Sequence, residues 1–249
     1  NSAFFNGNYV ISADHIAMGI FFNYNGSRMF VLDSNGDSVR EYNTTERWNI
    51  TTASWTSSLE NFSIGSQETE GRGIFFRGDG MKMYIAGTTG NDITQYNLSQ
   101  AWNVSTAAYF SEFSVSIQTA DPQDVFFEPD GDRMYVLGKG GSGDVHQYEL
   151  SNAWTATTAT YNKSYDFLGS TADPRGFYFH PNGTHLYIVN GDTDYLRDFI
   201  FQSPWNVSVP ASTGFYIFTT QSSFPESVFF KPEGDKMYMV GQDNDFVYE

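Results

Sequence analysis

The sequence predicts an all-β protein with the architecture of a five-bladed β-propeller, and three features support this. Phenylalanine, tyrosine and tryptophan make up 18% of the chain, and aromatic residues favour strands. An aromatic strand, a turn and a second strand recur five times, at intervals of 54, 51, 52 and 51 residues. The last unit also lacks a fourth strand that the amino-terminal residues can supply. A strand-rich unit repeated at this period is typical of propeller blades.

Each unit begins with a short apolar strand followed by a tight turn. In the third unit the strand is Val125-Phe126-Phe127 and the turn is residues 128–132, Glu-Pro-Asp-Gly-Asp. Proline presets φ in such a turn and glycine takes the left-handed position. The second unit shows the remaining strands at residues 82–86, 93–96 and 107–114. We therefore expect four antiparallel strands per blade.

The two ends of the chain are expected to close the ring. The last unit stops after its third strand, at residues 245–249, while residues 3–5 precede Ile20 by the spacing that separates residues 108–110 from Val125. Residues 1–12 are therefore predicted to be the strand that completes the last blade, which removes open sheet edges. Residues 1–249 then form a single five-bladed domain, with blade repeats that start near residues 19, 73, 124, 176 and 227.

Composition disfavours several classes of partner. The chain carries 13 lysines and arginines against 29 acidic residues, a net charge of −16, so phosphate backbones and anionic lipids are repelled and no nucleic acid is expected. There is no cysteine, which excludes disulfides, thiolate metal sites and a cysteine nucleophile. No apolar run approaches the roughly 20 residues that span a bilayer, so membrane insertion is not expected.

The repeat resembles that of a known family. Residues 126–136, followed by residues 144–151, resemble the YVTN-type and lactonase-like propeller repeats of microbial surface, secreted and phage structural proteins. That group contains enzymes, adhesive modules and structural proteins. The resemblance therefore implies the architecture and leaves the activity open.

A candidate ligand site lies where the first strands of the units begin, because loops at one face of a scaffold commonly hold ligands. Arg72 and Arg175 would bind a carboxylate or sugar hydroxyls, and Asp124 and Glu226 would accept hydrogen bonds. The alternative is that drifting repeats left unrelated polar side chains there. The residues directly before these strands are Gly19, Gly73, Asp124, Gly176 and Ser227. Asp124 is the one acid among them, whereas a glycosidase needs two, so catalysis is not predicted. The candidate residues are Arg72, Gln123, Asp124, Arg175 and Glu226.

Two further sets of residues recur from unit to unit. One aspartate precedes the third strand of each unit, and these could bind Ca²⁺ or hydrogen-bond their own turns; no other cofactor is expected. A tryptophan recurs between the third and fourth strands and could either stack on sugars or pack between blades. The aspartates are Asp37, Asp92, Asp144, Asp194 and Asp245, and the tryptophans are Trp48, Trp102, Trp154 and Trp205.

The N-x-[ST] pattern of glycosylation acceptors recurs along the chain, mostly in turns and connections. Asparagine, serine and threonine also suit turns, so both explanations remain open. The sites are Asn25, Asn43, Asn49, Asn61, Asn97, Asn103, Asn162, Asn182 and Asn206.

Together these features predict a non-catalytic, extracellular propeller on the surface of a cell, appendage or virion. It would act in adhesion or assembly, by self-association or by binding neighbouring surface proteins, and would be glycosylated. The first alternative is a glycan-binding, lectin-like propeller, and the second is a hydrolase or lactonase. The features that favour the main hypothesis are a complete fold, an acidic surface rich in glycosylation patterns and the lack of a catalytic cluster.

Overall fold

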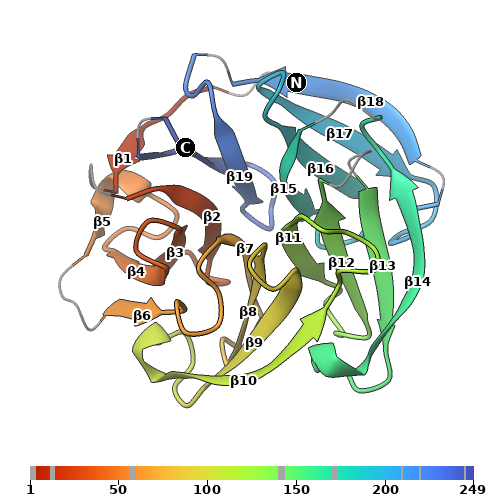
Figure 1. The fold of residues 1–249 in the computed structure, drawn as a ribbon. Helices are drawn as coiled ribbons and strands as arrows, with labels where there is room; N and C mark the ends of the chain where they lie inside the picture. Colours follow the sequence, from red (N-terminus) through yellow and green to blue (C-terminus); the bar gives the residue numbers. More distant parts are fainter. Residues whose placement is uncertain are drawn as a thin grey trace.

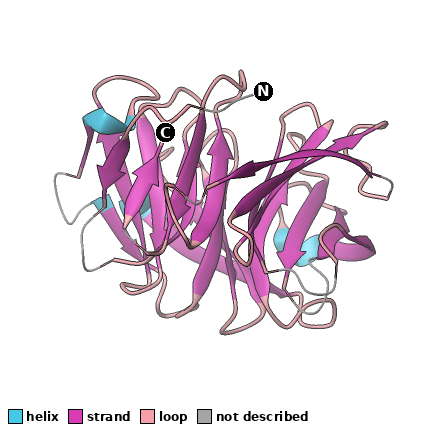
Figure 2. Cartoon of the chain, turned by 90° about the horizontal axis from the view of Figure 1, so that it is seen from above, coloured by secondary structure: helices cyan, strands magenta, loops and turns pink. Residues whose placement is uncertain are grey.

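The computed structural model describes residues 4–11, 15–55, 60–139, 144–169, 173–208, 210–218, 220–243 and 245–249. Five antiparallel sheets surround a central axis, with the first strand of each sequence repeat innermost (Figure 1). Figure 2 shows that connections between strands gather at the two ends of the sheets. The prediction of a five-bladed propeller is therefore confirmed.

The blades are numbered here in chain order of their inner strands. Blade 1 contains β2 (Ala17–Phe22), β3 (Arg28–Asp33), β4 (Ser38–Thr44) and an outer strand in two pieces, β5 (Ala53–Ser54) and β6 (Asn61–Ser63). Blade 2 contains β7 (Gly71–Phe76), β8 (Lys82–Gly87), β9 (Asp92–Leu98) and β10 (Ala107–Ser114). Blade 3 contains β11 (Pro122–Phe127), β12 (Arg133–Gly138), β13 (Asp144–Leu150) and β14 (Ala159–Asp166).

Blade 4 contains β15 (Pro174–Phe179), β16 (His185–Asn190), β17 (Tyr195–Phe201) and β18 (Pro210–Ile217). Blade 5 contains β19 (Pro225–Phe230), β20 (Met237–Gly241), β21 (Phe246–Tyr248) and, from the start of the chain, β1 (Asn8–Val10). Short 3₁₀ turns precede three of the outer strands, at Ile50–Thr52, Val104–Thr106 and Ala156–Thr158.

The closing strand is confirmed, with a shift of one residue from the expected match. β1 pairs antiparallel with β21, so that Tyr9 lies opposite Val247. In blade 2 the equivalent pair is Phe113 opposite Ile93. The alignment of the amino-terminal strand with the fourth strand of blade 2 is therefore shifted by one residue. The reason is that the connection from the closing strand to the first inner strand is one residue shorter than the connection that follows Phe113.

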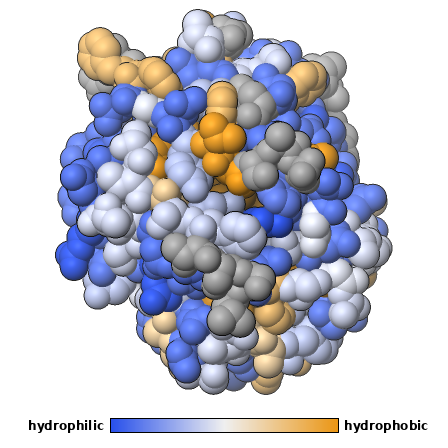
Figure 3. All heavy atoms as spheres, turned by 90° about the vertical axis from the view of Figure 1, so that its left-hand side faces the viewer, coloured by the Kyte–Doolittle hydropathy of each residue, from blue (hydrophilic) through white to orange (hydrophobic). Residues whose placement is uncertain are grey.

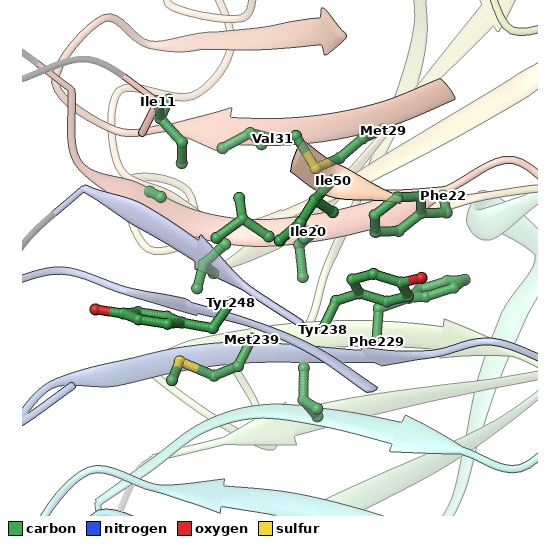
Figure 4. Packing of buried hydrophobic residues seen from close by; sticks show 14 of the residues in the cluster. Ile11, Ile20, Phe22, Met29, Val31, Ile50, Phe229, Tyr238, Met239 and Tyr248 are labelled. Carbon is green, nitrogen blue, oxygen red and sulfur yellow. The ribbon is translucent and has the colours of Figure 1, made fainter. Parts of the chain in front are cut away.

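The hydrophobic core continues across this closure. Figure 4 shows side chains of blades 1 and 5 meeting between their sheets. Phe22 and Tyr238 lie 4.3 Å apart between ring centroids, and Phe22 also contacts Phe229 at 5.4 Å. Ile11, just after β1, is 6% exposed and belongs to the same cluster. The first and last blades therefore share one packed core.

The recurring tryptophans pack between blades. The backbone N–H of Trp154 donates to the backbone carbonyl of Gly131, in the turn of the same blade, at 3.1 Å. The backbone carbonyl of Trp154 accepts from Tyr84 Oη of the preceding blade at 2.7 Å. A Cβ on Gly131, whose φ is 79°, would clash with the indole of Trp154. Each recurring tryptophan has a φ between 61° and 64°. This arrangement supports the packing alternative over the sugar-stacking one.

Polar groups dominate the face that carries β1 and the outer strands of blade 1. Figure 3 shows this side as mostly hydrophilic, with hydrophobic residues confined to small groups. In the part of the chain that the structure describes, no helix is long and apolar enough to cross a membrane.

Candidate functional site

The candidate residues lie at one end of the central axis, where the inner strands begin. Arg72, Gln123, Arg175 and Glu226 are the second residues of β7, β11, β15 and β19, respectively. Because these strands surround the axis (Figure 1), their starts face one another from different blades. We call these residues the polar ring.

The axis is closed beneath the polar ring by five aromatic side chains, one from each inner strand. Neighbouring rings in this set meet edge to face, with centroid distances of 5.0 to 5.7 Å and interplanar angles of 64° to 80°. A cavity of only about 10 Å³ remains along this part of the axis. Any ligand of the polar ring therefore enters from one face. The five residues are Phe21, Phe75, Phe126, Tyr178 and Phe229.

Arg175 and Glu226 form the centre of an ion-pair network. Arg175 Nη1 lies 3.1 Å from Glu226 Oε1, and Arg175 Nη2 lies 2.6 Å from Asp173 Oδ2. Lys139 also pairs with Asp173. The side chain of Glu226 is only 2% exposed, and that of Arg175 is 18% exposed. The network holds the buried carboxylate of Glu226 beside the guanidinium of Arg175, at the end of the central axis where the inner strands begin.

The environment of Glu226 favours proton exchange near neutral pH. Burial raises the pKa of Glu226 to about 7, although Arg175 and Arg72 oppose this rise. For Arg175, burial lowers the pKa, but the negative charges of Glu226 and Asp173 outweigh it and the pKa is raised. A carboxylate whose pKa lies close to the working pH is suited to general-base catalysis.

Both arginines retain unused hydrogen-bonding capacity. The Nε atoms of Arg72 and Arg175 are buried and have no hydrogen-bond partner among the described residues. Arg72 otherwise approaches Glu70 at 3.6 Å. A buried donor without a partner is costly. The side chains of Arg72 and Arg175 are 28% and 18% exposed, so a ligand can reach other atoms of both arginines.

Sequence reasoning missed the acids that support the ring. Glu70, Asp121 and Asp173 each lie two residues before a ring position, and residues two apart on a strand share a face. Gln123 Nε2 donates to Asp121, as Arg175 donates to Asp173. The recurring acid-x-polar spacing was the signal that could have revealed them.

A histidine near the same end of blade 1 was also missed. His15 Nδ1 lies 2.7 Å from Asp33 Oδ2, and Arg40 Nε lies 3.4 Å from the same oxygen. Asp33 is completely buried. The partners come from three different segments of blade 1, and their spacing in the sequence follows no repeat that would have indicated the contact.

Asp124 joins two inner strands. Its carboxylate accepts hydrogen bonds from the backbone N–H of Val125 at 2.8 Å and of Phe177 at 3.0 Å. A Cβ at Gly73 would clash with Asp124, so the neighbouring inner strand approaches this side chain closely. Asp124 was predicted to accept hydrogen bonds from a ligand, but its described bonds are to the protein backbone.

The pH dependence of stability should report on Asp124. Burial raises the pKa of Asp124 to about 8, with the two backbone N–H groups opposing the rise. The folded protein then binds more protons than the unfolded chain between about pH 4 and pH 8, so the stabilisation present at pH 4 is lost as pH rises through 8. We expect Asp124→Asn to remove up to about 1.4 kcal/mol per pH unit of this slope in urea unfolding. Asp130→Asn, at an exposed turn, should leave the slope unchanged; an unchanged slope in Asp124→Asn would contradict the assignment.

The five recurring aspartates are not structurally equivalent. Asp37, Asp194 and Asp245 precede their strands and have left-handed φ values of 43°, 52° and 55°, a position held by Asn91 in blade 2. Asp92 and Asp144 are instead the first residues of β9 and β13. The predicted ring therefore mixes two positions one residue apart, and in blade 2 Asn91 holds the earlier one. Among the residues that the structure describes, no three acidic or histidine side chains converge in a way that could hold a metal ion. Binding of Ca²⁺ stays a prediction.

Several glycosylation candidates take part in turn hydrogen bonds. In five of them the asparagine Oδ1 accepts from the backbone N–H two residues later, at 3.0 or 3.1 Å. This is the turn chemistry that the sequence left open as an alternative. Three of the nine candidates, Asn162, Asn182 and Asn206, are exposed. Glycosylation stays a prediction. The five turn-forming residues are Asn25, Asn49, Asn103, Asn182 and Asn206.

No protein-family model and no curated protein matches the chain. Solved structures do resemble it. A candidate 6-phosphogluconolactonase from Bacteroides uniformis is 15% identical with a TM-score of 0.53, covering 82% of this chain and 55% of its own. A second, from Bacteroides fragilis, is 14% identical with a TM-score of 0.54, covering 99% and 62%. The periplasmic gluconolactonase of Pseudomonas aeruginosa is 15% identical with a TM-score of 0.50, covering 81% and 54%.

These likenesses match the lactonase-like part of the resemblance seen in the repeats. This chain spans between about half and two thirds of the length of those proteins. They contradict the expectation of a non-catalytic structural or adhesive propeller, because the similar structures are named as lactonases. They give no support for a cell-surface or virion protein, for adhesion or for filament assembly. At this level of identity the likeness establishes the fold alone.

Proposed function

We propose that the protein is a hydrolase that opens a sugar lactone at the polar ring. The observation that carries the proposal is the pairing of Glu226, whose pKa burial raises to about 7, with Arg175 at the open end of a closed axis. The resemblance of the fold to proteins named as lactonases supports the same reaction class. It is the second of the two alternatives that the sequence left open.

The geometry suggests a role for each group in the reaction. The Glu226 carboxylate accepts a proton from water while the water oxygen attacks the lactone carbonyl carbon. Negative charge then develops on the carbonyl oxygen, and an arginine of the ring stabilises it. The bond between that carbon and the ring oxygen breaks, and the proton held by Glu226 passes to the departing oxygen. The product is a hydroxy acid, and no oxidant or reductant is consumed.

Arg72 and Arg175 also define the class of substrate. Their side chains are 28% and 18% exposed, and guanidinium groups bind carboxylate and phosphate with charge-assisted hydrogen bonds. We expect a sugar lactone with an anionic substituent to be preferred over a neutral one. The chain as a whole carries a net charge of −16, so this preference depends on Arg72 and Arg175.

The test is a hydrolysis assay with purified protein on neutral and phosphorylated six-carbon δ-lactones. Product acid is measured by NMR against spontaneous hydrolysis in the same buffer. We expect a rate above background for at least one lactone and a higher kcat/KM for the phosphorylated compound. If no lactone of either kind is opened faster than in buffer, the proposed function is wrong.

A further inference from the structure

One position beside the polar ring is structurally equivalent in all five blades. It is the residue just before the inner strand, and its backbone carbonyl accepts from the backbone N–H of the residue just after the second strand, at 2.8 to 3.2 Å. Because the same bond forms in every blade, the five residues can be compared directly. We call this place the mouth position, and its residues are Ile16, Glu70, Asp121, Asp173 and Phe224.

The mouth position shares a face of the blade with the polar ring, because residues two apart along a strand point to the same side. In blade 4 the mouth residue Asp173 lies 2.6 Å from Nη2 of the ring residue Arg175, and blade 3 has the corresponding contact. Phe224 stands in the same relation to Glu226, the proposed general base. The Phe224 side chain is therefore placed on the face of blade 5 that carries Glu226.

The mouth positions divide into a charged and an apolar sector. Blades 2, 3 and 4 carry an acid there, whereas blades 5 and 1 carry Phe224 and Ile16. The inner strands of these two blades, β19 and β2, lie side by side (Figure 1). The residue of blade 1 that corresponds to the polar ring is also apolar, Met18. A ligand at this end of the axis would meet charged groups on one side and apolar groups on the other.

Phe224 combines an exposed ring with a fixed backbone. It is 52% exposed, but its backbone N–H donates to Ser222 Oγ at 3.0 Å. The carboxylate of Asp243 in turn accepts from Ser222 Oγ, Ser223 Oγ and the backbone N–H of Ser223, at 2.5 to 2.9 Å. Binding to a part of the protein that is already held in place avoids the entropic cost of ordering it. The exposed ring of Phe224 is therefore suited to contact with a ligand.

We propose that Phe224 is a specificity-determining residue that packs against the C–H face of a cyclic sugar substrate. The inference rests on the proposed function for its class of substrate. A sugar ring presents C–H groups on its faces and hydroxyl groups around its edge, so one face can cover an aromatic side chain while the hydroxyls reach polar partners. Phe224 supplies the aromatic surface, and Glu226 and Arg175 lie beside it. A compound that keeps the ring is therefore bound more tightly than an open-chain polyol.

The test is isothermal titration calorimetry with glucono-δ-lactam, in which an N–H group replaces the ring oxygen of the lactone and slows hydrolysis. We expect saturable binding to the wild type, weakened about 3- to 10-fold by Phe224→Ala, the size expected for the loss of one aromatic contact. Phe224→Tyr keeps the aromatic ring and should bind within about twofold of the wild type. Sorbitol, an open-chain polyol, should bind more weakly than the lactam and should not distinguish Phe224→Ala from the wild type.

The matched control is Phe110→Ala, the same substitution at a phenylalanine of β10 that is 49% exposed. This residue lies on the outer strand of blade 2, far from the inner strands. The control should leave lactam binding unchanged, since exposed substitutions away from a site change little. Both phenylalanines are about half exposed, so both variants should keep the circular dichroism spectrum of the wild type.

Binding of the lactam separates this inference from the proposed hydrolysis. If Phe224→Ala weakens lactam binding but no lactone is opened by the wild type, the role of Phe224 is supported and the proposed hydrolase activity fails. If the wild type opens a lactone but Phe224→Ala changes neither KM nor lactam affinity, the role of Phe224 is wrong and the hydrolase proposal stands. The inference is also overturned if the lactam does not saturate the wild type below about 1 mM, the upper end of common KM values, or if sorbitol binds as tightly as the lactam. Equal losses in Phe110→Ala and Phe224→Ala would overturn it as well.

Discussion

Glu226→Gln is expected to lower kcat/KM for lactone hydrolysis by about 10²- to 10⁴-fold, the usual contribution of a general base. Glutamine keeps the size of the side chain and a hydrogen-bond acceptor for Arg175, but it cannot take a proton from water. Glutamate and glutamine have nearly the same shape, so the substitution should fit this packed site, where Glu226 is 2% exposed and lies 3.1 Å from Arg175. Initial rates of product formation measure the effect.

The matched control is Glu233→Gln, the same chemical change on an exposed glutamate of the turn after β19. It should leave kcat/KM within about twofold of the wild type, since exposed substitutions away from a site change little. If Glu226→Gln is folded and retains more than a tenth of the wild-type activity, Glu226 is not the base.

Removal of residues 1–11 is expected to cost about 3–5 kcal/mol of unfolding free energy, comparable with truncation of a large core side chain. The deletion removes β1, the contact of Tyr9 with Tyr42 at 5.6 Å and the buried Ile11. It also exposes the edge of β21. For a domain of this size the melting temperature should fall by roughly 10 °C, as measured by differential scanning calorimetry.

A shorter deletion distinguishes the loss of stability caused by removing β1 from the loss caused by shortening the chain. Removal of residues 1–5 keeps β1 and takes away Phe4 and Phe5, which are 84% and 57% exposed. It should lower the melting temperature by no more than about 2–4 °C, corresponding to about 1 kcal/mol. Equal losses from the two deletions would mean that β1 does not close the ring in the way described.

The sequence predicted the architecture because every blade repeats the same local contacts. The aromatic inner strand, the glycine turn and the tryptophan recur with nearly constant spacing, so one blade explains the others. Closure by the amino terminus followed from the missing fourth strand of the last unit. The pairing of Tyr9 with Val247 could not be predicted, because residue spacing alone does not reveal a connection shortened by one residue.

The chemistry of the site was harder to predict because it depends on contacts between blades. Arg175 and Glu226 are 51 residues apart, and only the fold brings their charges to 3.1 Å. The raised pKa of Glu226 depends on burial, which the sequence does not state. The search for two acids at equivalent positions missed an acid paired with cations. The finding that contradicts the expectation of a non-catalytic protein is the resemblance to structures named as lactonases.

The most direct test of the account is the pH dependence of kcat/KM for wild-type lactone hydrolysis between pH 5 and pH 8, corrected for spontaneous opening. Burial raises the pKa of Glu226 to about 7, and the base acts only when ionised. We expect kcat/KM to rise with pH through an apparent pKa near 7 and then to level off. A rate that never exceeds the spontaneous one, or a kcat/KM that does not change across this range, would contradict it.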